Sequence, residues 1–270
     1  MRTRIVALFC AVLAAAWAAE AGIAYTMQVS SDGGGQQGGG PGKMTLKGMI
    51  QDDNARIEFQ GQSGHGMPAG GYMLIKEGGA KTYMVDTENK MYFSMNTKDA
   101  ADMAGAMMGM KVSDVSVEKT LDEDGGKILG YQVRHVKIRT SYTMEMNVMG
   151  NQMKSSVAQE DEMWVADGIK LPNADEWMKP LKGALGGEFK KIADAQKEHM
   201  KGFPLKMVSL HTSTNPMGQT QTTKSTMEVT ELAEKDIPAG MFAIPADYRE
   251  QAMPQMPGPG AGRMPQRQNR

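Results

Sequence analysis

The chain has 270 residues and a formal net charge of −1, with nearly equal numbers of basic and acidic side chains. This balance argues against nucleic acid or any strongly charged molecule as the main partner. The length suffices for a sizeable hydrophobic core, and the single cysteine, Cys10, leaves disulfides no part in holding that core together.

The first 21 residues have the pattern of a secretory signal peptide. Arg2 and Arg4 give a positive start, and the run that follows is almost wholly apolar. Ala19-Glu20-Ala21 and Ala16-Trp17-Ala18 are both cleavage sites of the small-x-small type. The apolar run is shorter than a bilayer requires, and Cys10 lies inside it rather than at its end. We therefore expect a periplasmic or secreted protein with no lipid anchor and no transmembrane segment in the mature chain.

After the leader, apolar and polar residues alternate along most of the chain, which is the period of strands with one buried face. Clusters of Gly, Asn and Asp separate the alternating runs and predict turns, for example at 33–42, 122–126 and 215–218. The predicted strands cover 24–31, 43–50, 55–60, 72–76, 81–86, 90–95, 112–121, 131–138, 142–148, 153–157, 163–165, 205–212 and 219–232. Strands this close in sequence normally pair as an antiparallel meander.

The alternation changes phase within the central stretch 127–172. Val133 belongs to one phase and Val136 to the other, so the slip falls at Arg134-His135. We interpret the slip as a β-bulge, which would bend the strand and help the sheet to curl.

Three segments have helical character. Ala- and Met-rich residues at 98–110 predict a short helix, Asn173 or Asp175 caps a second one that ends near Leu181, and 188–200 is amphipathic. These helices would pack on one face of a single domain that spans residues 22–250. The tail, 251–270, is rich in Pro, Gly and Met and is predicted to be disordered.

Several motifs along the chain carry a family resemblance. They are KTYMVDTENKMYF at 81–93, GKILGYQVRHVKI at 126–138, EMWVADGIKLP at 162–172, GFPLKM at 202–207 and DIPAGMFAIPADY at 236–248. With the leader, they resemble the bacterial family called domain of unknown function 4412, and more distantly the LolA/LolB-like periplasmic lipoprotein carriers. In one departure, Gln132 stands where the closer family often has a cysteine, so a function that depends on that cysteine is absent.

The resemblance implies an α+β fold that is mostly antiparallel β: a strongly curved half-open β-barrel with two or three helices packed on one face as a lid. The carriers bind acyl chains in the apolar hollow of such a barrel. We therefore expect a non-enzymatic binding protein whose partner is a hydrophobic ligand or lipid. The side chains expected to line the hollow are Tyr83, Phe93, Tyr131, Met144, Met146, Val148, Met163 and Trp164.

Methionine is unusually abundant, with 27 residues. Flexible Met side chains fill irregular cores and pockets, which is the interpretation we favour. Soft thioethers also select Cu(I), so a copper site is an alternative, and so is a structural envelope protein with no small ligand. The candidate copper ligands are Met144, Met146, Met149 and Met153.

The sequence contains no convincing catalytic or cofactor motif. The acidic runs at 122–124 and 160–162 are interpreted as solvated turns or edges. The histidines His65, His135, His199 and His211 lack the spacing of a metal site. We therefore expect no enzymatic activity and no cofactor.

Overall fold

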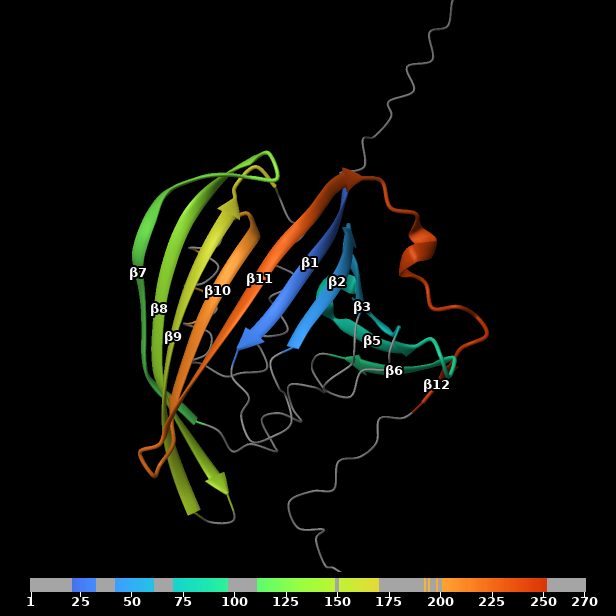
Figure 1. Cartoon of the computed structure of the whole chain (residues 1–270). Coiled ribbons are helices and arrows are strands. Elements are labelled where there is room, and N and C mark those ends of the chain that lie inside the picture. The colour runs from blue at the N-terminus through green and yellow to red at the C-terminus, as the bar shows by residue number, and fades with distance from the viewer. Residues whose placement is uncertain are drawn as a thin grey trace, which may run out of the picture.

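The computed structural model describes residues 21–32, 42–60, 70–96, 111–148, 151–169 and 201–251, together with Ile192, Asp194 and Glu198. The strands of the described residues form a single 12-stranded sheet (Figure 1). They are β1 (Gly22–Asp32), β2 (Gly42–Gln51), β3 (Asn54–Gln60), β4 (Tyr72–Lys76), β5 (Lys81–Asp86), β6 (Met91–Asn96), β7 (Lys111–Ile128), β8 (Tyr131–Val148), β9 (Asn151–Ala166), β10 (Phe203–Thr214), β11 (Thr220–Lys235) and β12 (Arg249–Glu250). The short 3-10 helices are η1 (Glu77–Gly79) and η2 (Ala239–Phe242).

The strands lie in the order β12-β6-β5-β4-β3-β2-β1-β11-β10-β9-β8-β7 (Figure 1). The run from β2 to β6 and the run from β7 to β11 each pair in chain order, as the predicted meander requires. Strand β1 joins the two runs, because it pairs with β2 on one side and with β11 on the other. Every pairing is antiparallel except that of β12 with β6.

Buried apolar residues gather in separate clusters along the sheet. One draws its residues from β1, β8, the end of β9 and the residues after it, β10 and β11, and consists of Ile23, Met27, Val133, Ala166, Ile169, Phe203, Leu205 and Val229. A second, on β8 and β9, consists of Val136, Ile138, Met163 and Val165. A third, on β4 and β5, consists of Tyr72, Leu74 and Val85, with Ile244 and Tyr248 of the C-terminal segment packed against it.

The predicted fold class is wrong. The described residues form an all-β sheet whose end strands, β12 and β7, do not pair with one another, and the sheet is neither closed nor strongly curled. They contain no α-helical element that would serve as a lid. The predicted helices at 98–110 and 173–181 fall outside the described residues, and of 188–200 only Ile192, Asp194 and Glu198 are described, each of them helical.

The prediction of a bulge at Arg134-His135 is wrong, because the bulge lies on β7 and not on β8. These two residues pair in unbroken register with Val165 and Trp164 of β9, so β8 itself is regular there. The extra residue belongs to β7, where positions 125 and 126 together lie opposite position 133 of β8.

The phase slip within β8 has a different cause, since this part of β8 is buried on both faces. Val133 is 2% exposed and Val136 is 0% exposed, although the two-residue period points them to opposite faces. Apolar residues on both faces break the alternation that a half-buried strand would show.

Two further boundaries differ from the prediction. The acidic segment 122–126 is not a turn, because β7 continues through it to Ile128 and the chain reverses at Leu129 and Gly130. The two segments predicted at 153–157 and 163–165 are parts of one strand, β9. The central strands are therefore longer than their turn signals suggest.

Residues 1–20 and 252–270 lie outside the described part of the chain, so the leader and the tail stay predictions. Within the described part, no helix is long and apolar enough to cross a membrane.

Candidate functional site

One face of the sheet carries a row of apolar side chains that crosses neighbouring strands. Residues that lie directly opposite one another in antiparallel strands share a face. The pairing from β8 to β2 connects one such residue from each strand. The row consists of Val136, Met163, Met207, Met227, Val29 and Met44.

We call this side of the sheet the methionine face. The same pairings, together with the two-residue period, assign each strand methionine to a face. Among the strand methionines whose side chains the structure describes, all except Met49 lie on the methionine face. These methionines are Met27, Met44, Met73, Met84, Met91, Met95, Met144, Met153, Met163, Met207 and Met227. Most are half-buried, so thioether and methylene groups of this face remain partly accessible.

A polar patch adjoins the apolar row. We define it as Thr140, Gln159, Asp161 and Ser209, which lie on the methionine face two residues or more beyond the row. The Gln159 amide donates to both Asp161 carboxylate oxygens at 2.9 and 2.8 Å, and the Ser209 hydroxyl also donates to Asp161. Asp161 is 5% exposed and Thr140 is 1% exposed. The Thr140 hydroxyl has no hydrogen-bond partner within the described part of the chain.

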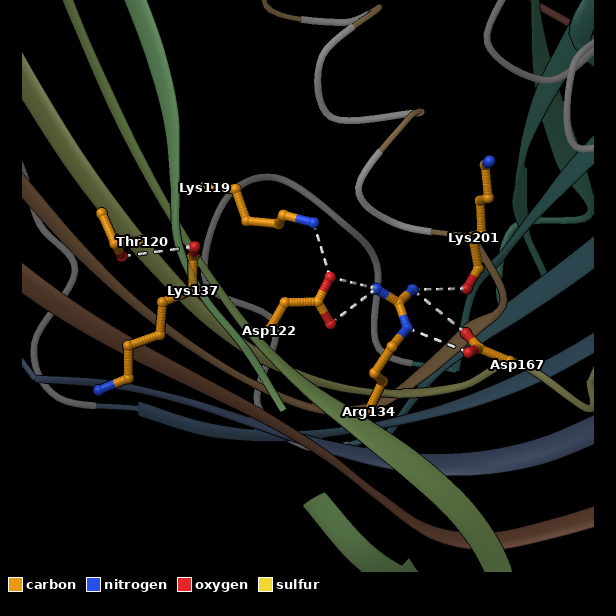
Figure 2. A network of polar contacts seen from close by, with 7 residues as sticks. All are labelled: Lys119, Thr120, Asp122, Arg134, Lys137, Asp167 and Lys201. Carbon is orange, nitrogen blue, oxygen red and sulfur yellow. Dashed lines mark hydrogen bonds and ion pairs between the residues drawn. The ribbon is translucent and has the colours of Figure 1, made fainter. Parts of the chain in front are cut away.

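A network of charged side chains lies at the β7 end of the apolar row. Figure 2 shows the Arg134 guanidinium between two carboxylates, with Nε 3.0 Å from Asp167 Oδ2 and Nη1 3.2 Å from Asp122 Oδ1. Lys119 Nζ reaches Asp122 Oδ2 at 2.6 Å, and Arg134 also donates to the Lys201 carbonyl. The hydrogen bond from Lys119, followed by those from Arg134, lowers the pKa of Asp122. The network ties β7 and β8 to the turn after β9 and leaves its charges balanced.

The reverse face of the same strands is built from aromatic and charged pairs. The His135 ring stacks on Trp164 with centroids 4.5 Å apart and planes at 9°. Its Nδ1 lies 3.1 Å from Glu123 Oε1 and its Nε2 lies 2.8 Å from Glu162 Oε1, so each ring nitrogen faces a carboxylate. Lys137 Nζ lies 3.1 Å from the same Glu162 oxygen.

A glycine on β7 and two hydrogen bonds to Glu162 hold the stacked pair of His135 and Trp164 in place. A Cβ on Gly125 would lie 3.1 Å from Trp164 Cδ1 and 3.1 Å from the His135 backbone nitrogen, so glycine allows β7 to approach the ring pair. Burial on its own would raise the pKa of Glu162, but hydrogen bonds from His135 and Lys137, with their charges, lower it overall. The polar groups of this reverse-face cluster are therefore satisfied by one another.

The residues predicted to line a hollow do not meet in one place. Phe93, Met144 and Met163 lie on the methionine face, whereas Tyr83 and Trp164 lie on the reverse face. Tyr131 packs beside the cluster around Val133, and its hydroxyl lies 3.4 Å from Glu234 Oε1. Met146 and Val148 occupy register positions opposite Met153 and Asn151.

The structure brings only part of the predicted set of copper ligands together. Met146 and Met153 are direct cross-strand partners, and Met144 lies two residues before Met146 on β8. Met149 falls outside the described residues. Among the residues that the structure describes, no group of three or more His, Cys, Asp or Glu side chains could hold a metal ion.

The polar patch was missed by reasoning from the sequence. The sequence predicts a solvated edge for the acidic run 160–162, but only Glu160 and Glu162 lie on the reverse face, whereas Asp161 is buried on the methionine face. A signal was present, because Asp161 is in phase with Val157, Met163 and Val165, all of which are buried. No feature of the sequence marks Thr140 as special.

Comparisons with known proteins add a family and a weak structural likeness. A model of the family described as domain of unknown function (DUF4412) matches residues 27–248. No protein with a curated description matches the chain. A solved structure of PNGF-II in space group P21 is similar at 15% identity with a TM-score of 0.33, over 86% of this chain and 32% of that chain. The chain thus spans about a third of the length of the solved structure that it matches.

Proposed function

The chain belongs to the family of domain of unknown function 4412, and from its site we propose that it is a non-enzymatic, periplasmic or secreted protein that binds an apolar chain against the methionine face. The observation that carries this proposal is the segregation of strand methionines to one side of the sheet. Apolar residues of any half-buried strand gather on one face, but most methionines of this face stay half-buried. Flexible, polarisable side chains that remain partly accessible suit a surface that accepts chains of varied shape.

The energetic basis is burial of the ligand's methylene groups. Each buried CH₂ contributes about 0.8 kcal/mol, so a long acyl chain gains enough to bind in the micromolar range once association costs are subtracted. From the more distant LolA/LolB resemblance we keep only the ligand class, an acyl chain. The open sheet replaces the expected hollow with a surface.

The test compares the same substitution on the two faces of one strand. Met227 and Thr226 are neighbours on β11, both half-buried, and point to opposite faces. Met227→Asp should weaken binding of the neutral fluorescent probe N-phenyl-1-naphthylamine about tenfold or more, because a carboxylate resists desolvation. Thr226→Asp should leave binding within about twofold. Both variants must first show the wild-type circular dichroism spectrum and a comparable melting temperature.

Two results would contradict the proposed binding. Folded wild-type protein that binds no apolar probe would favour a structural envelope protein with no small ligand. Equal weakening of probe binding in both variants would remove the methionine face from the site.

Export through the leader has a separate test. The charged start and the apolar run predict that the mature protein begins close to Gly22. N-terminal sequencing of the protein purified from the periplasm or the medium reads this directly. A chain that retains Met1 would contradict the proposed localisation and leave the binding proposal untouched.

A second candidate function, Cu(I) binding, is favoured by one observation, the cross-strand placement of Met146 opposite Met153 with Met144 beside them. Thioether sulfurs are soft ligands that select Cu(I). A titration in competition with a Cu(I) chelator tests it. Submicromolar affinity that is lost in the Met144→Leu, Met146→Leu double variant would place copper ahead of the apolar chain.

A further inference from the structure

We propose that the polar patch binds the ammonium group of an amphiphile whose apolar chain lies against the methionine face. This inference rests on the proposed function and adds to it the chemical class of the head group. Two buried polar side chains support it: within the described residues no ion pair includes Asp161, and the Thr140 hydroxyl has no hydrogen-bond partner.

The patch and the apolar row are neighbours on each strand that they share. Asp161 lies two residues from Met163 on β9, and Ser209 lies two residues from Met207 on β10. Two residues of a strand span about 6.6 Å, so the polar and apolar rows are adjacent. An amphiphile bound across this boundary would place its head on one row and its chain on the next.

Asp161 has hydrogen bonds but, among the residues that the structure describes, no countercharge. Its carboxylate accepts from the Gln159 amide and from the Ser209 hydroxyl, which are neutral donors. Within the described part of the chain, no ion pair includes Asp161. A buried carboxylate is stabilised when a cation joins its neutral donors, and one carboxylate balances one singly charged head group.

Thr140 supplies an acceptor at the same place. It lies directly opposite Gln159, whose amide is bonded to Asp161. Its hydroxyl oxygen is buried and has no hydrogen-bond partner among the described residues. An ammonium group carries three donors, so it can donate to the Asp161 carboxylate and to Thr140 Oγ1 together.

The other polar clusters suit a head group less well. Arg134 already lies between the carboxylates of Asp122 and Asp167. His135 lies between Glu123 and Glu162 on the reverse face, away from the methionines. An anionic head group would be repelled by Asp161, which separates this proposal from the binding of a free fatty acid.

The test uses three ligands that share one chain length and differ in the head: hexadecylamine, hexadecanol and hexadecanoic acid. Each competes with N-phenyl-1-naphthylamine for the full mature protein at pH 7. Hexadecylamine should bind about tenfold more tightly than hexadecanol, and hexadecanoic acid should bind more weakly than hexadecanol.

A pair of lysolipids tests the hydrogen bonds of the ammonium group. Lysophosphatidylethanolamine should displace the probe better than its choline counterpart, because a quaternary nitrogen has no N–H to donate. Equal displacement by the two lysolipids would overturn the role of the N–H donors.

Two variants locate the head group. Asp161→Asn should abolish the preference for the amine and leave hexadecanol binding unchanged. Thr140→Val should reduce amine affinity about threefold, whereas Thr212→Val, on the reverse face, should leave it unchanged. If Asp161→Asn does not fold, Thr140→Val and Ser209→Ala carry the test, and both should narrow the preference for the amine.

The two proposals fail in distinguishable ways. Equal binding of the three ligands would overturn the head-group inference and leave the proposed function standing. Failure of all three to displace the probe would overturn both.

Discussion

Met163 and Trp164 follow one another on β9, yet they belong to two differently built surfaces. On the reverse face, residues opposite one another are matched: His135 stacks on Trp164, and Lys137 pairs with Glu162. On the methionine face, Met163 lies between Val136 and Met207, and these apolar side chains make no directional bond. The two surfaces use the same backbone but different kinds of side-chain contact.

The difference indicates that one face of the sheet specifies the strand register and the other face is available for binding. Matched cross-strand pairs favour one register over its neighbours, because a slip of one residue would move every side chain to the other face. With register specified on the reverse face, the methionine face is free to carry side chains that suit a ligand.

Met163→Ala should lower the free energy of unfolding by about 2–5 kcal/mol, because it removes a side chain that is only 1% exposed. Urea unfolding followed by circular dichroism measures the change. Met153→Ala is the matched control on the same strand and face, where the side chain is 36% exposed and the cost should be below about 1 kcal/mol. Equal losses would show that the buried part of the methionine face does not support the fold.

Gly125→Ala should cost about 1–3 kcal/mol, since the added methyl group would crowd Trp164, His135 and Val133. The same unfolding measurement detects it, and the near-ultraviolet circular dichroism of Trp164 should change with it. Gly168→Ala is the control, because a Cβ there meets nothing within 4 Å. An unchanged stability in Gly125→Ala would mean that the reverse-face pairing tolerates displacement of β7.

Glu162 should give the smallest effect, visible as a dependence of stability on pH. Its pKa is lowered in the folded protein from an ordinary value of 4.5, so its contribution is present above that value and is lost as pH falls through the folded pKa. Unfolding free energies measured from pH 7 to pH 3 should therefore fall less steeply in Glu162→Gln. An unchanged slope in Glu162→Gln would contradict this role of Glu162.

Strands with one buried face could be predicted from the sequence. The alternation placed β4 and β5 at their observed bounds, 72–76 and 81–86. It failed where β8 is buried on both faces, because Val133 and Val136 then break the two-residue period without a bulge on β8. The expectation of a curled sheet drew on that misinterpreted slip.

The turn between β7 and β8 could not be predicted from residue types. Asp and Gly at 122–126 have the composition of a turn, but the chain reverses at Leu129 and Gly130, with φ of 51° and 85°. A two-residue hairpin turn favours positive φ, and leucine rarely adopts it. The pairing on either side of this turn outweighs that local preference.

The candidate site was predictable only in part. The abundance of methionine pointed to an apolar ligand, but their common face depends on pairings between strands that are far apart in sequence, such as β1 with β11. The acidic neighbours Glu160 and Glu162 suggest a solvated run, so the burial of Asp161 is not predicted, although Asp161 is in phase with the buried Met163. Thr140 becomes notable only through its burial, which no local pattern reveals.

The shortest strand of the sheet, β12, has a consequence for solubility. Its neighbour β6 carries Met91, Tyr92, Phe93 and Met95, and such a strand with a free edge is a template for pairing with another chain and for aggregation. β12 covers the first part of that edge, opposite Met91 and Tyr92: the backbone nitrogens of Arg249 and Gln251 donate to the carbonyls of Lys90 and Tyr92 at 3.0 and 2.9 Å. Two exposed, oppositely charged residues then form the outer border of the sheet. The C-terminal segment thus keeps the first part of β6 from pairing with another chain.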